Sequence, residues 1–306
     1  MSNKYKKATL SINSIKRKTN VIFNLLFSIY CILCLSPLML ILVVSITDEE
    51  SLISNGYTFF PTKISFTAYR YLLLNYEKIL RAYGVTIFVC IVGTFISVLL
   101  TLLFAYPISR KSFRYRNVFS FYIFFTMLFN GGLVPWYILY TQYLNLDDSP
   151  AALIVPPLVS AFNVLVVKTY LSMNLPDAII ESARIDGAGE FRIFYKIVIP
   201  LSVPVIATIG LFSVLMYWND WYLCLLFIHD PKYYNVQYTM YQVLRSIEFL
   251  TSSQASSVGE ASNELLKVPG ETLRMAMAII GVGPIVFAYP FFQKYFIKGL
   301  TLGAIK

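Results

Sequence analysis

The residues that most often carry out chemistry in proteins are scarce in this sequence. It contains four cysteines and a single histidine, His229. Cys31 and Cys34 form a C-x-x-C pair, but no second pair or histidine accompanies them, so apolar packing is favoured over a zinc or redox site. One histidine supports neither a Cys/His metal cluster nor a Ser-His-Asp triad. The sequence therefore predicts no metal site and no catalytic residues.

One segment, residues 175–200, combines acids, glycines and prolines at a spacing that can form a protruding elbow. Pro176 suits a first helical turn, and acids follow it near the positive end of the helix. Gly187 and Gly189 permit a turn that a side chain would obstruct. Beyond the turn, apolar residues recur at helical spacing up to Pro200. We expect a short helix, a glycine break and a second amphipathic helix, and we call residues 175–200 the elbow.

The composition shows what surrounds these residues. The 306-residue chain is 57% hydrophobic and 13% charged, whereas soluble domains are about one quarter charged. Its mean hydropathy is +0.65. This excludes a disordered chain, a coiled coil and an ordinary water-soluble enzyme, and it requires lipid around much of the surface. The net charge of +9 fits basic loops near anionic lipid, so we expect no nucleic-acid partner.

Six charge-free apolar stretches are each long enough to cross a hydrocarbon core of about 30 Å as a helix. Because they are apolar on every face, they predict helices rather than the alternating strands of a barrel. The expected fold is an all-α polytopic membrane protein with six transmembrane helices, at about residues 21–46, 83–108, 118–142, 150–171, 199–219 and 275–293.

The distribution of basic residues predicts the orientation. Most of the 25 lysines and arginines fall on one side of the six segments, in the tail at 1–20, in two gaps that include the elbow, and after the last segment. Positive residues favour the cytoplasm, so we expect both termini and the elbow to be cytoplasmic. Residues 220–273 then form a long extracytoplasmic loop, and loops of more than about 15 residues are usually functional or disordered.

The apolar cores of these segments contain no Asp, Glu, Lys, Arg or His. Carriers coupled to ions or protons generally place such groups at membrane depth, so their absence argues against a self-powered secondary carrier. It does not exclude one, because carbonyls and hydroxyls can bind sodium. The sequence also lacks a G-x-x-x-x-G-K-[S/T] phosphate loop. If this chain moves a solute uphill, we expect the energy to come from another subunit and the chain itself not to be an enzyme.

The elbow resembles the EAA loop of ABC-importer permeases, whose pattern is E-A-A-x3-G-x9-I-x-L-P. Glu181-Ser182-Ala183 is followed by Gly187 and then by Ile197-Val198-Ile199-Pro200 at the spacing of that pattern. The departures, Ser182 for alanine and Ile199 for leucine, are mild. Ile185–Ala188 reads I-D-G-A, which is similar to the carbohydrate branch of the family.

Further stretches agree over roughly residues 20–306. Phe104–Arg110 ends the second apolar segment as in the family, Trp218–Trp221 follows the fifth, and Lys298–Lys306 resembles the C-terminal signature. Phe129–Pro135 is similar to the LplC/YtcP-like subgroup of maltose-type permeases, which is associated with oligosaccharides from complex polysaccharides. The chain is identified on these motifs as a member of the binding-protein-dependent transport family.

The resemblance implies a type I ABC-importer permease fold over residues 21–306, in the cell membrane of a bacterium. The implied partners are a second homologous permease, a cytoplasmic ABC ATPase dimer, an extracytoplasmic solute-binding protein, the lipid bilayer and an oligosaccharide substrate. ATP and Mg would be bound by the ATPase, and this chain would bind no cofactor. The 220–273 loop would reach the binding protein. The elbow would couple to the ATPase through Glu181, Ser182, Ala183, Asp186, Gly187, Ile197 and Pro200.

The path of the substrate is expected where aromatic and hydrogen-bonding side chains occur together, because sugars are held by both. Interfacial anchoring explains Trp and Tyr at membrane ends equally well. The candidates are Trp136, Tyr137, Trp218, Asn219, Asp220 and Trp221. Two alternatives stay open, namely an ABC permease for another solute class and a stand-alone secondary carrier.

Overall fold

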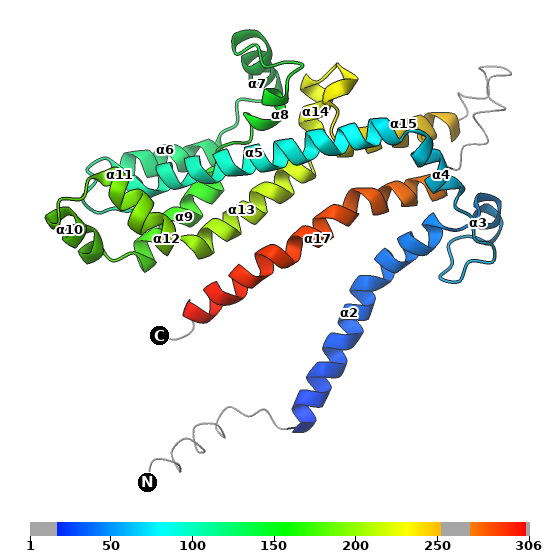
Figure 1. Ribbon diagram of the computed structural model, residues 1–306, viewed down its shortest axis with the longest axis horizontal. Helices are drawn as coiled ribbons and strands as arrows, with labels where there is room; N and C mark the ends of the chain where they lie inside the picture. Colours follow the sequence, from blue (N-terminus) through cyan, green and yellow to red (C-terminus); the bar gives the residue numbers. More distant parts are fainter. Residues whose placement is uncertain (1–16, 252–269, 304–306) are drawn as a thin grey trace. The chain divides into compact units, whose positions relative to one another are not determined.

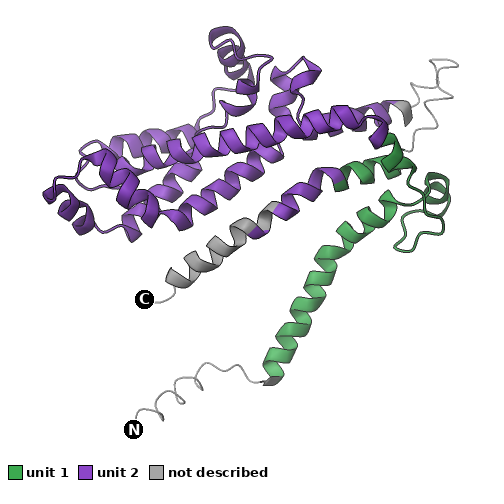
Figure 2. Cartoon of the chain, viewed as in Figure 1, with its two compact units in different colours: residues 1–71, 263–279 green, residues 72–262, 280–306 purple. Residues whose placement is uncertain are grey.

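The computed structural model describes residues 17–251 and 270–303, and these residues are mainly helical (Figure 1). An isolated antiparallel bridge pairs Thr47 with Ile64. The chain divides into two compact units, residues 1–71 with 263–279 and residues 72–262 with 280–306 (Figure 2). Most of the predicted basic tail and the polar second half of the predicted 220–273 loop lie outside the described residues.

The first unit holds α2 (Arg17–Ser45) and α3 (Glu49–Asn55). α2 is strongly apolar and yet exposed along most of its length, which is the pattern of a helix surrounded by lipid. α4 (Thr67–Leu74) and α17 (Glu271–Gly303) each begin in the first unit and end in the second.

The carboxylate of Glu49 caps the N-terminus of α17. Its Oε1 atom accepts hydrogen bonds from the backbone N–H groups of Gly270 (3.0 Å) and Glu271 (2.9 Å). Its Oε2 atom accepts one from the N–H of Thr272 at 3.0 Å. The first amide groups of a helix have no partner within the helix and form its positive end, so a carboxylate there stabilises the helix start.

α5 (Tyr76–Ser109) is the central helix of the second unit. α9 (Ala161–Asn174) and α13 (Val203–Trp218) pack along it, and α6 (Arg116–Leu128) contacts both α5 and α9 (Figure 1). Buried apolar side chains form one cluster at the C-terminal end of α5 and another nearer its N-terminal end. The two ends of this helix therefore anchor two separate cores.

The predicted third segment, 118–142, is not one helix. α6 ends at Leu128, and the chain resumes as α7 (Leu133–Ile138) and the π-helical turn η1 (Leu139–Tyr143), bent by 114° from α6. The break falls at Asn130-Gly131-Gly132, where Gly132 has a φ of +88°. Glycine adopts this conformation without the clash that a Cβ would cause, so the glycine pair permits the sharp change of direction.

The predicted fourth segment, 150–171, is also divided. α8 (Pro150–Ile154) stops just before Pro156-Pro157, and α9 begins only at Ala161. Proline has no backbone N–H and restricts the residue before it, so a pair of prolines cannot continue a helix without losing hydrogen bonds. The prediction of one continuous helix was wrong here, because the length of the apolar stretch does not show the break that these two prolines cause.

The described residues provide two to four candidate membrane spans, so the six predicted spans are not confirmed. Lys18–Ser45 and Tyr76–Ser109 are each long and apolar enough alone. Two bent pairs qualify if each is one span, namely α6 with Leu133–Tyr143, and Glu190–Leu201 with α13 at a bend of 80°. The predicted sixth segment, 275–293, lies inside α17, which contains Pro284 and Pro290.

The first part of the predicted 220–273 loop is helical rather than irregular. It forms α14 (Tyr222–Phe227), the short turn η3 (Pro231–Tyr233) and α15 (Val236–Thr251). The Thr86 hydroxyl of α5 accepts a hydrogen bond from the N–H of Val236 at 2.9 Å. This contact ties the start of α15 to the central helix.

Side chains of neighbouring helices satisfy backbone carbonyls that the helix breaks set free. The Tyr217 hydroxyl donates to the carbonyl of Ile154, at the end of α8, at 3.0 Å. The Tyr83 hydroxyl donates to the carbonyl of Ile280 at 2.6 Å. In a regular helix that carbonyl would pair with the N–H of residue 284, which is Pro284 and has none. At these two breaks the carbonyls are therefore paired by side chains of other helices.

Gly93 allows α5 and α13 to approach closely. A Cβ at this position would lie 2.5 Å from Cζ of Tyr217, far inside van der Waals contact. At Gly84, in the same helix, a Cβ would meet nothing within 4 Å. Packing therefore requires a glycine at position 93 and not at position 84.

We expect Gly93→Ala to destabilise the protein by about 1–3 kcal/mol, because the methyl group would displace the buried Tyr217 ring. Gly84→Ala is the matched control, and it should be neutral or stabilising because alanine is the better helix former. Thermal unfolding of both variants in the same detergent measures the difference. Equal melting temperatures for the two variants would contradict the close approach of α5 and α13.

Candidate functional site

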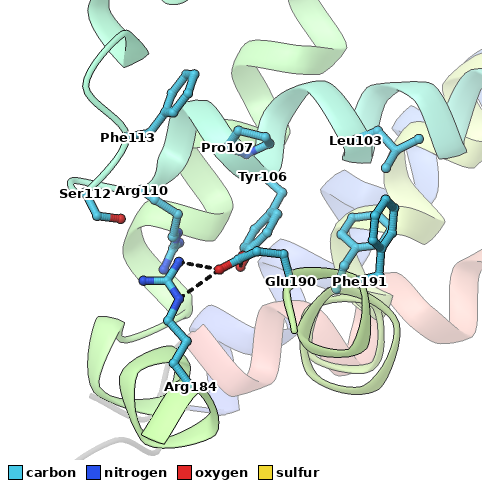
Figure 3. Close-up of a pocket in the computed structure, with 10 residues that line it drawn as sticks. Leu103, Tyr106, Pro107, Arg110, Ser112, Phe113, Arg184, Glu190 and Phe191 are labelled. Atoms are coloured by element: carbon cyan, nitrogen blue, oxygen red, sulfur yellow. Dashed lines mark hydrogen bonds and ion pairs between the residues drawn. The ribbon is translucent and has the colours of Figure 1, made fainter. Parts of the chain in front are cut away.

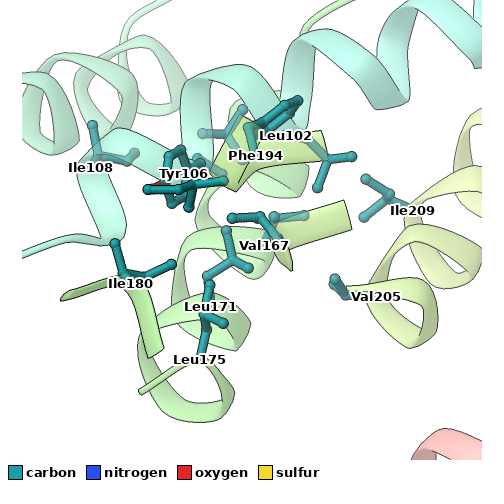
Figure 4. Close-up of a cluster of buried hydrophobic side chains, with 14 of the residues drawn as sticks. Leu102, Tyr106, Ile108, Val167, Leu171, Leu175, Ile180, Phe194, Val205 and Ile209 are labelled. Carbon is teal, nitrogen blue, oxygen red and sulfur yellow. The ribbon is translucent and has the colours of Figure 1, made fainter. Parts of the chain in front are cut away.

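The elbow folds onto the core of the second unit. It consists of α10 (Asp177–Ile185), α11 (Glu190–Ile193) and the π-helical turn η2 (Phe194–Val198), followed by the short α12 (Ile199–Leu201). α10 buries one face, where Ile180 is only 2% exposed. Figure 4 shows this side chain with the buried residues of α5, α9 and η2. The expected helix, glycine break and second helical stretch are all present, and they are anchored rather than free.

The glycine break has the geometry of a Schellman motif. Gly187 has a φ of +78°, and its N–H donates to the carbonyl of Arg184 at 3.0 Å. The N–H of Ala188 donates to the carbonyl of Ala183 at 2.9 Å. These two bonds satisfy the last carbonyls of α10, and the left-handed residue between them favours glycine. Gly189 differs, since its φ is −70° and any residue can adopt it.

The residues predicted for ATPase coupling divide between a buried face and an exposed face. Ala183 is buried and Ile197 is half-buried, whereas the other five are exposed, namely Glu181, Ser182, Asp186, Gly187 and Pro200. Glu181 and Asp186 make no ion pair with any described residue. Ile185 lies beside them and is 86% exposed. Unpaired acids around an exposed apolar side chain form a surface suited to a partner protein.

A buried arginine that the sequence analysis did not single out holds the elbow in place. Arg110, at the end of α5, is only 5% exposed. Its Nη2 donates to the carbonyl of Leu171 (2.8 Å), and its Nη1 donates to the carbonyl of Leu175 (2.9 Å). Nη1 also pairs with Oδ1 of Asp177 at 3.1 Å, and Nε donates to the Ser109 hydroxyl at 3.0 Å. One guanidinium therefore joins α5, the end of α9 and the start of α10.

The role of Arg110 follows from its geometry rather than from its charge. Its planar guanidinium bonds two carbonyls, a carboxylate and the Ser109 hydroxyl through three nitrogens held in a fixed geometry, whereas an ammonium group has one nitrogen and three donors. In the sequence it appears only as one of several basic residues near the end of an apolar segment. Its place within Phe104–Arg110 was the one signal that could have drawn attention to it.

A second polar contact links α10 to α11 beside a surface cavity of about 530 Å³. Glu190 accepts hydrogen bonds from Arg184 through Oε1 (2.8 Å) and from the Tyr106 hydroxyl through Oε2 (3.2 Å). Figure 3 shows Arg184 reaching across from α10 to Glu190, with Tyr106 of α5 behind the pair. Because Arg184 and Glu190 are both exposed, the ion pair adds little stability.

At the other end of α5, only two of the six predicted substrate-path residues line one cavity. Trp136 and Asp220 border a cavity of about 490 Å³. The other four are engaged elsewhere. Tyr137 stacks on Phe227 (ring centroids 5.6 Å apart), Trp218 donates to the Gly281 carbonyl (3.0 Å), Asn219 donates to the Leu215 carbonyl (2.8 Å), and Trp221 stacks on Tyr241 (4.6 Å).

Asp220 lies just past the end of α13, outside the membrane-spanning segment, in an unusual electrostatic position. Burial raises its pKa from 3.8 to about 6, although hydrogen bonds from the N–H groups of Leu223 and Tyr222 partly oppose the shift. The bond from Leu223 measures 3.1 Å. No lysine or arginine among the described residues pairs with this carboxylate. The site therefore holds an uncompensated negative charge at neutral pH.

The described residues contain no group of three or more histidine, cysteine or acidic side chains that could hold a metal ion. Cys31 and Cys34 are exposed on α2, whereas Cys90 and Cys224 are buried in the cluster nearer the start of α5. The predicted site residues that are described lie mainly on the exposed face of the elbow and around the cavity of about 490 Å³.

Comparison with known proteins identifies the family. Residues 16–302 match the family of binding-protein-dependent transport system inner membrane components. The chain belongs to this family. As a member, it is a permease, the subunit of an ABC transporter that has no ATPase site of its own.

Two relatives from Bacillus subtilis (strain 168) are similar over most of this permease. The polygalacturonan/rhamnogalacturonan transport system permease protein YtcP is 36% identical over 284 residues, covering 93% of this chain and 96% of YtcP. Protein LplC is 34% identical over 270 residues, covering 88% of each chain. A crystal structure of a bacterial ABC transporter involved in the import of the acidic polysaccharide alginate includes a chain with a TM-score of 0.76 and 27% identity, covering 92% of this permease and 97% of that chain.

We expect Arg110→Met to destabilise the permease by roughly 2–5 kcal/mol, because it leaves the Leu175 carbonyl without a donor and removes charge-assisted bonds to the Leu171 carbonyl and to Asp177. Arg110→Lys should recover only part of this loss. Lys111→Met is the control, since Lys111 is exposed and adjacent. Thermal unfolding in detergent measures all three variants, and a melting temperature for Arg110→Met equal to that of Lys111→Met would contradict the role of Arg110.

The raised pKa of Asp220 predicts a pH-dependent stability difference. Between pH 3.8 and about 6 the folded state binds more protons at this group than the unfolded state, so the carboxylate destabilises the fold as pH rises through that window. Asp220→Asn keeps the hydrogen-bond acceptor and removes the charge. It should raise stability by on the order of 1–3 kcal/mol at pH 7.5. Melting temperatures that differ equally at pH 7.5 and pH 4 would contradict this assignment.

Proposed function

We propose that this permease is one of two membrane subunits of an ATP-driven importer of oligosaccharides, and that its elbow docks on a cytoplasmic ATPase. The observation that carries the proposal is the exposed face of α10. Glu181, Asp186 and Ile185 are exposed there, while Ile180 on the opposite face is buried in the core. Because the opposite face of α10 is packed into the core, a push on the exposed face by a partner would move the core rather than unfold α10.

The docking surface and the membrane helices would move together. Arg110 bonds α10 and α9 directly to α5, so a displacement of the elbow displaces the central helix of the unit. ATP-driven closure of two ATPase subunits would then bias the permease pair between inward-facing and outward-facing states. The energy would come from the ATPase, and the elbow of this chain would pass the movement of the ATPase on to the membrane helices.

Three further parts of the proposal rest on the resemblance and on charge distribution. The oligosaccharide cargo is supported by the printed names of two similar proteins, a polygalacturonan/rhamnogalacturonan transport permease of Bacillus subtilis and an arabinooligosaccharides transport permease of Halalkalibacterium halodurans. The inside position of both termini and of the elbow is supported by the excess of basic residues on that side. The remaining partners would be a second homologous permease and an extracytoplasmic binding protein that meets residues 220–273.

Two glycine positions test the docking surface. Gly187→Asp should abolish sugar uptake and release the ATPase, because a side chain at a φ of +78° distorts the Schellman turn on the docking face. Gly189→Asp adds the same charge two residues further along, at a φ of −70°, and should keep uptake. A Cβ at either position meets nothing within 4 Å, so neither change causes a clash within this chain.

The measurement is co-purification of the ATPase through an N-terminal tag on the permease, together with uptake by the same cells. We expect at least a tenfold loss of ATPase recovery for Gly187→Asp, with the permease still inserted. Uptake that survives Gly187→Asp would show that the elbow is not the coupling site. Recovery of the wild-type permease alone, even after gentle cross-linking, would favour a stand-alone carrier.

A further inference from the structure

Two breaks in the helical structure and the end of a third helix meet around one cavity in the second unit. The cavity of about 490 Å³ is lined by Asn130 and Gly132 from the break after α6, by Pro156 and Pro157 from the break after α8, and by Asp220 from the end of α13. Within a membrane, non-helical backbone is tolerated only where protein buries it or where it lines a water-filled cavity. In transporters such interrupted helices commonly build the substrate site. We therefore consider this cavity, where the two breaks and the end of α13 come together, as a binding site.

The side chains of this cavity have the chemistry that recognises a sugar ring. Trp136 and Tyr222 supply aromatic surface, and Asn130 and Asp220 supply hydrogen-bonding groups. The C–H face of a pyranose packs against an aromatic ring, while its hydroxyls need donors and acceptors at the edge. An acyl chain in the same place would offer no acceptor to the amide nitrogen of Asn130 and no donor to the Asp220 carboxylate beyond the backbone N–H groups that it already has.

The polar groups retain free hydrogen-bonding capacity, and the aromatic wall is held in place. Oδ1 of Asn130 accepts from the N–H of Gly132 at 2.9 Å, whereas its Nδ2 donates to no described residue. Trp136 contacts Phe227 and Tyr140, with ring centroids 5.1 and 5.4 Å away. A rigid aromatic group beside unused donors and acceptors is a preformed site, so a ligand binds it with little loss of side-chain freedom.

The charge of the cavity discriminates between sugars. Among the described residues that line it, Asp220 is the one that is charged at neutral pH, and no described lysine or arginine neutralises it. A carboxylate accepts hydrogen bonds from hydroxyl groups but repels another carboxylate. A ring that carries a carboxyl group would bring a second negative charge into this partly buried site.

We propose that this cavity binds a neutral pyranose ring of the transported glycan, stacked on Trp136 with its hydroxyls bonded to Asp220 and Asn130, and that Asp220 disfavours uronate rings at this position. The inference rests on the proposed transport of oligosaccharides and adds a site and a specificity to it. The specificity concerns the one ring that occupies this cavity, and it leaves open uronate rings elsewhere in the transported glycan.

Saturation-transfer NMR tests the site directly and without the binding protein. The assembled permease pair with its ATPase is placed in nanodiscs and mixed at pH 7.5 with one of four probes, which are galactotriose, maltotriose, xylotriose and trigalacturonate. We expect at least one neutral trisaccharide to receive saturation on a single ring, and trigalacturonate to receive none. No signal from any neutral probe would overturn the inference.

Matched variants assign the signal to the cavity. Trp136→Leu should reduce it at least fivefold, whereas Trp221→Leu, which alters an aromatic residue outside the cavity, should retain it. Asp220→Asn should admit trigalacturonate, and the exposed Asp147→Asn should not. Because Asp220→Asn is expected to stabilise the fold, misfolding would not explain a changed preference. Equal losses for the two tryptophan variants, or trigalacturonate binding by the wild type, would refute the site.

Uptake separates this inference from the proposed function. ATP-dependent uptake of a glycan by the wild-type transporter with its binding protein, combined with a normal signal from Trp136→Leu, would retain the importer and refute the cavity. Absence of uptake of any glycan by the complete wild-type assembly would refute the importer itself, whatever the NMR signal.

Discussion

Every backbone carbonyl that a helix break sets free inside this protein needs a donor, because lipid offers none. The described structure meets this requirement with side chains from neighbouring helices. Arg110 donates to the carbonyl of Leu175, Tyr217 to that of Ile154, and Tyr83 to that of Ile280. These bonds do more than remove a penalty. Each bond links one helix to another. The helix breaks are therefore also places where the helices of the second unit are held together.

These bonds between side chains and freed carbonyls have different consequences near the two ends of α5. At the C-terminal end, the guanidinium of Arg110 and the buried face of α10 form a rigid joint, and the exposed residues of the elbow are left for a partner. Nearer the N-terminal end, the breaks leave a cavity with aromatic and polar walls. α5, a helix of 34 residues, contributes buried side chains both to the cluster behind the elbow and to the cluster beside Trp136.

Glycines show how the same residue type has different roles in this fold. A side chain at position 93 would clash with Tyr217, and position 187 has a left-handed backbone that favours glycine. Neither reason applies to Gly84. Motif spacing alone identifies Gly187, because the turn is a local property of the chain. No local signal marks Gly93, because the group that would clash with a side chain is more than a hundred residues away in the sequence.

The membrane class, the helical character, the family and the residues of the elbow could all be predicted from the amino-acid sequence, because apolar composition, periodicity and motif spacing are local properties. The sequence also contained the breakers at Gly131-Gly132 and Pro156-Pro157, although apolar length alone predicted unbroken helices across both. The contact of Arg110 with α9 and α10 could not be predicted and is known from the folded structure. The same holds for the cavity that Trp136 and Asp220 share and that Trp218 and Trp221 do not line. Which side chain meets a freed carbonyl, and which breaks converge, depends on how distant helices pack, and that information is spread over the whole chain.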